Sequence, residues 1–385
     1  MPNFDVSVTP CADYSEAELT RALDEALSAV GGLDWVKQGM TVAIKANLVV
    51  FFKPERAATT HPSLLCALVK RLHERGAKII LGDSPGGLYN AAFVNRVYAA
   101  TGMSIVEKAG ATLNNNFSQV TVEHPSAKIA KHFTYTAYLD EADAIINFCK
   151  LKSHGMMGMS AAAKNMFGTV PGTMKPEYHF KYPDPADFAD MLIDIDEYFA
   201  DKMRLCIVDA VVGMEGNGPT QGTPKQIGAV LAGTNPHKVD LACATIIGAS
   251  TDSVPTLAAA INRGLTPDSV DKLAVSGDLS QFIVPDFDRV DASVAALHFS
   301  GNGAFARLRG AFLHACLQSK PKLTAKECVG CNECGRICPA KAIVMKNGKA
   351  VIDRKKCIKC FCCQEFCPKG AMKVGRTLIA KLLNK

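Results

Sequence analysis

Apolar residues in the first 250 positions fall into two kinds of run. Some are short and rich in valine, isoleucine and leucine, which is typical of buried strands: residues 41–44, 78–81, 144–148 and 205–208. Others repeat apolar residues at helical spacing, at 62–75 and 187–199. Strands that alternate with helices predict an α/β fold built on a large, mostly parallel sheet.

The pattern continues less clearly toward the C-terminus. We expect a strand at 227–231, a helix at about 237–247 and a short strand at 272–275. An amphipathic helix is predicted at 301–318, and a short one in the tail at 377–383.

Eight of the fifteen cysteines form two copies of one spacing, C-x2-C-x2-C-x3-C-P. The first copy is Cys328, Cys331, Cys334 and Cys338, and the second is Cys357, Cys360, Cys363 and Cys367. Short C-x2-C steps wrap the backbone around a cluster, whereas the fourth cysteine reaches the other cluster. A zinc ribbon or a set of disulfides would not explain the repeated run with its trailing proline.

The spacing therefore predicts two 4Fe-4S clusters that are ligated crosswise. One would take Cys328, Cys331, Cys334 and Cys367, and the other Cys357, Cys360, Cys363 and Cys338. Residues 324–374 resemble the bacterial-type two-cluster ferredoxins, which implies a small α+β domain. Cys362 lies outside the spacing, and we expect it to be a buried bystander.

These patterns divide the chain of 385 residues into parts. We expect an α/β domain at 1–318, a linker at 319–324, the two-cluster domain at 325–375 and a tail at 376–385.

Charge is distributed unevenly. Residues 320–385 hold sixteen Lys or Arg against four Asp or Glu, whereas the whole chain has a net charge of only +6. Clusters compensate part of this charge, and the rest would attract an acidic electron carrier such as a ferredoxin or flavodoxin, or would simply form a solvated surface. The basic run Arg354, Lys355, Lys356 and Lys359 is the candidate docking site.

Composition excludes other classes of protein. No apolar run is long enough to span a membrane, and no basic patch is interleaved with aromatic residues as in nucleic-acid-binding proteins. Free thiols and oxygen-sensitive clusters indicate a reducing, cytoplasmic location in an anaerobe.

Polar residues follow the predicted strands, where ligands bind in open α/β sheets. Several of these stretches together resemble the family called domain of unknown function 362, in the order KAN 45–47, TTHP 59–62, GDSPG 82–86, KLKSH 150–154, AKNMFG 163–168 and GMEGNGP 213–219. In that family the domain is often followed by a two-cluster ferredoxin module, so the resemblance implies an architecture and a redox role. It implies no particular substrate or catalytic residue.

The residues themselves indicate an anionic ligand. Lysines at strand ends beside glycine loops would form a cationic pocket for phosphate or carboxylate groups if they converged. The candidate binding residues are Lys45, Asn47, Lys150, Lys152, Lys164 and Asn165.

For proton transfer we select His154 and Asp209. His61 and His179 are weaker candidates, because a single histidine is more often structural. Asp83 and Glu215 are further candidate bases or magnesium ligands, although Asp83 lies in a turn sequence that also suits a helix cap.

Signatures for nicotinamide, ATP and radical S-adenosylmethionine chemistry are missing from the sequence. A flavin or a further metal ion remains compatible with the glycine loops. The leading hypothesis is an iron–sulfur oxidoreductase that passes electrons to an anionic substrate or second cofactor in the α/β cleft. Two alternatives stay open: an electron carrier that docks a partner enzyme, and a non-redox enzyme, resembling racemases or isomerases, with structural or sensing clusters.

Overall fold

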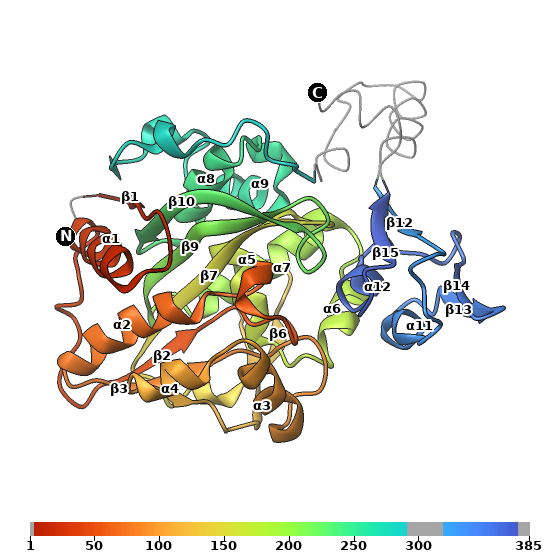
Figure 1. Cartoon of the computed structure of the whole chain (residues 1–385), viewed down its shortest axis with the longest axis horizontal. Helices are drawn as coiled ribbons and strands as arrows, with labels where there is room; N and C mark the ends of the chain where they lie inside the picture. Colours follow the sequence, from red (N-terminus) through yellow and green to blue (C-terminus); the bar gives the residue numbers. More distant parts are fainter. Residues whose placement is uncertain (1–3, 291–318, 376–385) are drawn as a thin grey trace.

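A computed structural model describes residues 4–290 and 319–375. These residues form a large α/β domain and a much smaller domain packed against one end of it (Figure 1). The expected helices at 301–318 and 377–383 lie outside the described residues.

One mixed sheet runs through the large domain. From edge to edge its strands are β11 (Val275–Ser276), β1 (Val6–Pro10), β10 (Thr223–Gly233), β9 (Met203–Glu215), β7 (Ala144–His154), β2 (Thr41–Lys45), β3 (Lys78–Gly82) and β4 (Thr112–Leu113), with β8 (Gly158–Ser160) paired to β7. The run from β9 to β4 is parallel, whereas β10 is antiparallel to both β9 and β1. The predicted α/β fold with a mostly parallel sheet is confirmed.

Helices cover both faces of this sheet (Figure 1). One face carries α1 (Glu16–Ala29), α2 (Pro62–Glu74), α3 (Ala91–Ala100) and α4 (Ser104–Lys108). The other carries α5 (Ala162–Asn165), α7 (Pro185–Tyr198), α8 (Pro236–Ile246) and α9 (Pro255–Asn262). Alternate strand residues enter opposite cores: Ile146 and Phe148 face the first set of helices, and Ile145 and Cys149 face the second.

Two strands extend well beyond the predicted ones. The residues 149–154 and 213–215, expected to lie in the polar loops after the strands, continue β7 and β9. The hairpin with β8 keeps the end of β7 extended, and antiparallel pairing with β10 does the same for β9 as far as Glu215. These segments are polar, and polar segments are usually predicted as loops. Their pairing with β8 and β10 cannot be predicted from the local sequence.

Smaller elements complete the large domain. Strands β5 (Gln119–Glu123) and β6 (His132–Thr136) form a separate ribbon, and the short helix α6 (Lys175–Lys181) lies near the small domain. The strand expected at 272–275 was wrong: a 3-10 turn occupies Val270–Lys272, and β11 begins only at Val275.

The small domain is a pair of two-stranded sheets with two short helices. Strand β12 (Lys320–Leu323) pairs with β15 (Met372–Gly375), and β13 (Ile343–Lys346) pairs with β14 (Lys349–Ile352). The helices are α11 (Glu333–Ile337) and α12 (Cys362–Glu365). The segment 319–324, expected to be a linker, therefore contains a strand, because its backbone bonds to the last strand of the domain.

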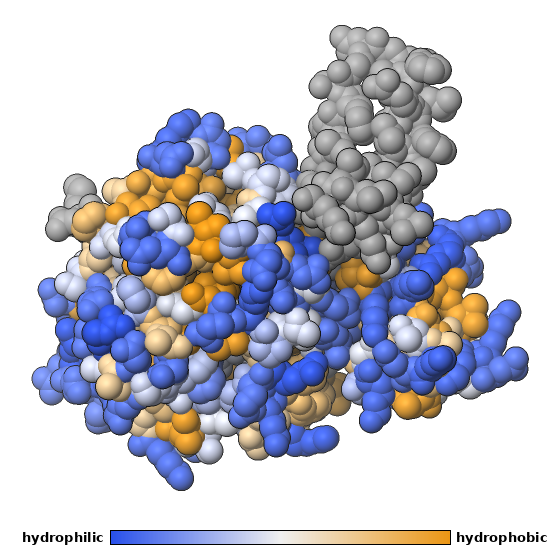
Figure 2. All heavy atoms as spheres, turned by 45° about the horizontal axis from the view of Figure 1, so that its top comes forward, coloured by the Kyte–Doolittle hydropathy of each residue, from blue (hydrophilic) through white to orange (hydrophobic). Residues whose placement is uncertain are grey.

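The surface mixes hydrophilic and hydrophobic residues. In the small domain a few hydrophobic side chains stand among long hydrophilic ones (Figure 2). Val329, Val344 and Val351 of this domain are exposed. Within the described residues, no helix has the length and apolar character needed to cross a membrane.

Candidate functional site

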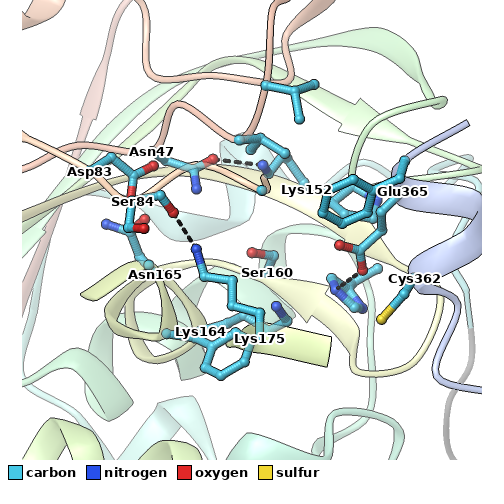
Figure 3. A pocket seen from close by; sticks show the side chains of 18 of the residues that line it. Asn47, Asp83, Ser84, Lys152, Ser160, Lys164, Asn165, Lys175, Cys362 and Glu365 are labelled. Carbon is cyan, nitrogen blue, oxygen red and sulfur yellow. Dashed lines mark hydrogen bonds and ion pairs between the residues drawn. The ribbon is translucent and has the colours of Figure 1, made fainter. Parts of the chain in front are cut away.

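A cavity of about 80 Å³ lies at the carboxyl ends of β2, β3 and β7, between the large domain and α12 (Figure 3). The polar side chains that the large domain contributes are Asn47, Asp83, Ser84, Lys152, His154, Ser160, Lys164, Asn165, Lys175 and His179. Helix α12 contributes Cys362 and Glu365, and Phe366 follows the helix. Both domains thus supply walls of one cavity.

A buried ion pair lies beside this cavity. The Lys45 Nζ is 2.7 Å from Asp83 Oδ1, and the backbone N–H of Leu48 donates to the other carboxylate oxygen at 2.7 Å. A Cβ at Gly168 would lie 2.4 Å from both charged atoms of the pair, so only glycine lets this turn approach so closely. Asp83 therefore pairs with a lysine and does not cap a helix, and Lys45 does not line the cavity.

Three lysines point into the cavity itself. Lys152 donates to Asn47 Oδ1 at 2.6 Å and to the carbonyl oxygen of Ala58 at 2.8 Å. Lys175 donates to the carbonyl oxygen of Ser84, and the ammonium group of Lys164 lies over the ring of Phe167. Each named acceptor is neutral (Figure 3).

Burial lowers the pKa of all three lysines because a charged group loses its hydration there. The pKa of Lys152 is about 7, with burial as the main cause and the nearby charge of Lys164 as the next. Burial also brings the pKa of Lys175 to about 7 and lowers that of Lys164. The three ammonium groups are thus held in a site that disfavours their charge.

His154 links the two domains across the cavity. Its Nδ1 accepts hydrogen bonds from the backbone N–H groups of Met156 and Met157, at 3.1 and 3.2 Å. The proton of the neutral ring is therefore on Nε2, which lies 3.3 Å from Glu365 Oε1. Burial lowers the pKa of His154 to about 4.

Glu365 is the charged residue that the small domain places in the cavity. Burial alone would raise its pKa, but the contact with His154 and the charge of Lys164 outweigh burial and bring the pKa to about 2. His179, also in the wall, stacks on Phe188 with ring centroids 4.3 Å apart, and burial lowers its pKa to about 3.

The candidate binding residue Asn165 serves mainly to join strands. Its Nδ2 donates to the carbonyl oxygen of Lys45 at 3.0 Å and to Asn147 Oδ1 at 2.8 Å. Asn165 thereby ties β2 to β7 and fixes the start of the 3-10 turn Met166–Thr169 at the cavity.

Lys150 and Asp209 form a second, closed group outside the cavity. Lys150 Nζ lies 2.8 Å from Asp209 Oδ2 and 2.8 Å from the hydroxyl of Tyr14, which in turn donates to Asp209 Oδ1 at 2.8 Å. His61 stacks on Tyr14 with ring centroids 3.6 Å apart, and its backbone N–H donates to Asp209 at 2.9 Å. Every charge in this group has an internal partner.

The expected convergence of four lysines is therefore only partial. Lys152 and Lys164 line the cavity, Lys45 lies behind it, and Lys150 belongs to the closed group. The structure does not bring Asp209 to His154, because Asp209 is held by Lys150 and Tyr14.

Other candidates from the sequence lie away from the cavity. His61 caps α2, since its Nδ1 accepts from the N–H of Ser63 at 3.3 Å. Glu215 accepts from the N–H of Asp288 at 3.0 Å and lies 3.9 Å from Lys225.

The eight cysteines of the two repeated runs lie in the small domain. Four of them line one hollow: Cys328, Cys331, Cys334 and Cys367. In the other set, burial and then the thiols of Cys360, Cys357 and Cys338, followed by Cys334 of the first set, raise the pKa of Cys363, so these thiols lie close to Cys363. The sulfur donors fit iron–sulfur clusters, and the crosswise division of the eight cysteines between two clusters stays a prediction from their spacing.

The duplicated sequence also produces a duplicated geometry around the sulfur atoms. The N–H of Ala342 donates to Cys338 Sγ at 3.2 Å, and the N–H of Ala371 donates to Cys367 Sγ at the same distance. Such N–H···S bonds support a thiolate ligand of a cluster and tune its potential.

Comparison with known families identifies both parts of the chain. The family described as Domain of unknown function (DUF362) matches residues 42–245, and a 4Fe-4S dicluster domain matches residues 320–368. This chain belongs to the DUF362 family.

Two known proteins resemble this DUF362 protein. A thylakoid-associated protein, sll1697, of Synechocystis sp. is 31% identical over an alignment of 272 residues, and the match covers 68% of this chain and 80% of the relative. The lactate racemase apoprotein of Thermoanaerobacterium thermosaccharolyticum resembles it weakly, with a TM-score of 0.39 and 14% identity over 63% of this chain and 56% of the other.

Polar contacts hold the dicluster domain of this DUF362 protein against the large domain. Gln364 Nε2 donates to the carbonyl oxygen of Asn217 at 2.7 Å, and the N–H of Val374 donates to Asn217 Oδ1 at 2.8 Å. Thr220 donates to the carbonyl oxygen of Glu365 at 3.2 Å. These contacts come from the GMEGNGP stretch and its neighbours, so that motif serves in docking.

Sequence reasoning missed three residues in the cavity wall. Lys175 follows no predicted strand, and Glu365 lies within the second cysteine run, where only the cysteines attract notice. Cys362, expected to be a bystander, is buried and lines the cavity one residue before a cysteine of the second set.

Proposed function

We propose that this protein is an iron–sulfur oxidoreductase that transfers electrons through two 4Fe-4S clusters to an anionic ligand in the cavity between its domains. One observation carries this proposal: α12 contains Cys363 of the second set and also places Cys362 and Glu365 in the cavity wall. The second set is thus adjacent to the ligand.

The two sets differ in exposure in a way that suits a directional path. Cys331 of the first set is exposed, whereas Cys360 and Cys363 of the second are buried. Clusters of this type, when bound, supply one-electron transfer. We infer that electrons pass to the ligand from the second set.

The protein's own residues would bind the ligand and manage its protons. Lys152 and Lys164 would bind negative groups of the ligand, and Asn47 holds the Lys152 ammonium in position. His154, neutral with its single proton on Nε2, would donate a hydrogen bond to the ligand from that atom. Lys152 and Lys175, whose pKa values are about 7, would supply the proton. Asp209 is too well paired with Lys150 to share this role.

The electron donor in this proposal is an acidic carrier, a ferredoxin or flavodoxin, in a reducing cytoplasm. Lys355 and Lys356 are exposed on the small domain, and the fourteen described cysteines are all free. An association rate that falls steeply with added salt would support this docking, because exposed charges are screened.

Cluster assignment can be tested with neighbouring cysteines. In protein purified without oxygen, Cys363→Ala should lose about half of the iron, whereas the matched control Cys362→Ala should keep it. Native mass spectrometry of the unmodified protein should show the mass of two 4Fe-4S clusters, and it would also reveal a bound flavin or further metal. Equal iron in both variants would contradict the ligand sets.

Electron delivery can be tested without knowing the ligand. The protein is first reduced with dithionite and freed of excess reductant. A small-molecule extract of cells should then reoxidise it, and the return of cluster absorbance measures this reoxidation. Lys152→Ala and Lys164→Ala should retain their iron and lose this reoxidation. Reoxidation at the wild-type rate in both variants would refute the proposed site, and turnover that does not require reduced clusters would favour the non-redox alternative.

A further inference from the structure

The cavity lysines lack the counter-charge that buried lysines elsewhere in this protein have. Lys45 and Lys150 each lie within 2.8 Å of a carboxylate oxygen. Among the described residues, no carboxylate oxygen lies within 4.0 Å of the ammonium nitrogen of Lys152, Lys164 or Lys175. A buried lysine without a charged partner loses its proton more readily, so three such lysines around one cavity point to a counter-charge from outside the chain that would keep them protonated.

The carboxylates near the cavity do not fill this need. Asp83 is committed to Lys45 and to the N–H of Leu48. Glu365 has its Oε1 3.3 Å from His154 Nε2. When all four lysines, Lys45 included, are protonated, two carboxylates face four ammonium groups, and two positive charges have no carboxylate to match them.

The wall also holds unused hydrogen-bonding groups. The hydroxyl of Ser84 and the Nδ1 of His179 have no partner among the described residues, although the two side chains are only 1% and 3% exposed. Buried polar atoms are normally bonded, so unpaired ones beside a cavity indicate a missing ligand. A tetrahedral or branched anion has oxygen atoms enough to bond both these groups and the lysines.

We propose that the cavity binds a compact dianion, either a phosphate or a small dicarboxylate, whose charges are shared by Lys152, Lys164 and Lys175. A site of about 80 Å³ has room for about five to eight water-sized atoms, which suits a compact anion. The proposal rests on the proposed function in one respect, that the dianion is the anionic ligand near the second cysteine set. Binding itself requires no electron transfer.

An alternative assigns the lysine charges to the neighbouring cluster, which carries negative charge with its four thiolates. That explanation predicts a different result. Loss of a lysine would then lower the reduction potential of the cluster, and no added anion would bind.

The experiment is calorimetric titration of the oxidised, cluster-loaded protein with inorganic phosphate, malonate and acetate. We expect phosphate or malonate to bind at least tenfold more tightly than acetate. Lys164→Met and Lys175→Met should each weaken that binding at least tenfold. The matched control is Lys181→Met, an exposed lysine on the same helix as Lys175, which should bind as the wild type does.

Several results would overturn the proposal. They are no dianion binding at millimolar concentration, equal affinity for acetate, or equal effects of Lys175→Met and Lys181→Met. Lys175→Arg serves as a control for loss of folding, because it keeps the positive charge. At equal iron content it should retain more affinity for the dianion than Lys175→Met. Dianion binding without any reoxidation of reduced clusters would refute the redox function and leave this site intact.

Discussion

Lys150 and Lys152 lie two residues apart on β7, yet they belong to opposite kinds of site. Lys150 is enclosed with Asp209 and Tyr14, and every charge there is matched inside the protein. Lys152 meets only neutral acceptors and faces a cavity with two more lysines. A buried lysine that is paired with a carboxylate of the protein stabilises the fold, whereas lysines without such a partner are available to an anionic ligand.

The largest expected effect comes from breaking the closed group. Asp209→Ala would strand the ammonium of Lys150 in the core, and removal of one partner of a buried ion pair costs about 3–5 kcal/mol. Denaturant unfolding followed by circular dichroism should show this loss. The double variant Lys150→Met/Asp209→Ala should recover much of it, and a single variant within about 1 kcal/mol of the wild type would show that the group is not closed.

A matched change in the cavity should leave stability almost untouched. Lys175→Met strands no carboxylate, so we expect the free energy of unfolding to change by less than about 1 kcal/mol, in either direction. The same denaturant titration measures it. A loss as large as that of Asp209→Ala would mean that Lys175 has an internal partner after all.

The pH dependence of binding sharpens the contrast further. The pKa values of Lys152 and Lys175 are about 7. Below pH 7 both are charged before an anion arrives; above pH 7 the anion must first draw protons onto them. Sulfate is a dianion throughout this range. As the pH rises above 7, its affinity should therefore fall by up to about tenfold per pH unit for each lysine that must take up a proton.

Calorimetric titration with sulfate at pH 6, 7 and 8 measures this slope. The variant Lys175→Met should show a shallower slope than the wild type, since one titrating group is gone. An affinity independent of pH would indicate that both lysines remain charged.

The smallest effect concerns the wall that α12 provides. A Cβ at Gly86 would lie 2.6 Å from the ring of Phe366, so Gly86→Val should press α12 away from the cavity. Hydrogen exchange should become faster in α12 and stay unchanged in the segment around Tyr14, which serves as an internal control. Unchanged exchange in α12 would show that the Phe366 ring moves aside freely.

Sequence patterns predicted the scaffold because the scaffold depends on local regularities. The strands near residues 41–44 and 78–81 and the helix near 62–75 are apolar, periodic and bounded by turn residues, and the structure has them. The two cysteine sets were equally readable, since eight residues at fixed spacing define them.

The cavity was less predictable because it depends on contacts between distant segments. Whether Lys150 binds a ligand or an aspartate was decided by Asp209, fifty-nine positions away in the sequence. Lys175 and Glu365 reach the cavity from α6 and α12, and neither lies in a strand-end motif. Only the docking of the small domain reveals that they share a wall.

Because α12 forms one wall of the cavity, the two domains could not be separated into independent proteins without changing the cavity. A large domain produced by itself would present an open cationic hollow, which would attract many anions and discriminate poorly among them. An independent ferredoxin could replace the attached one only if it also supplied a carboxylate and a thiol where Glu365 and Cys362 stand. The same short helix therefore determines both the specificity for the bound anion and the specificity for the electron-donating domain, so a change in α12 would alter both.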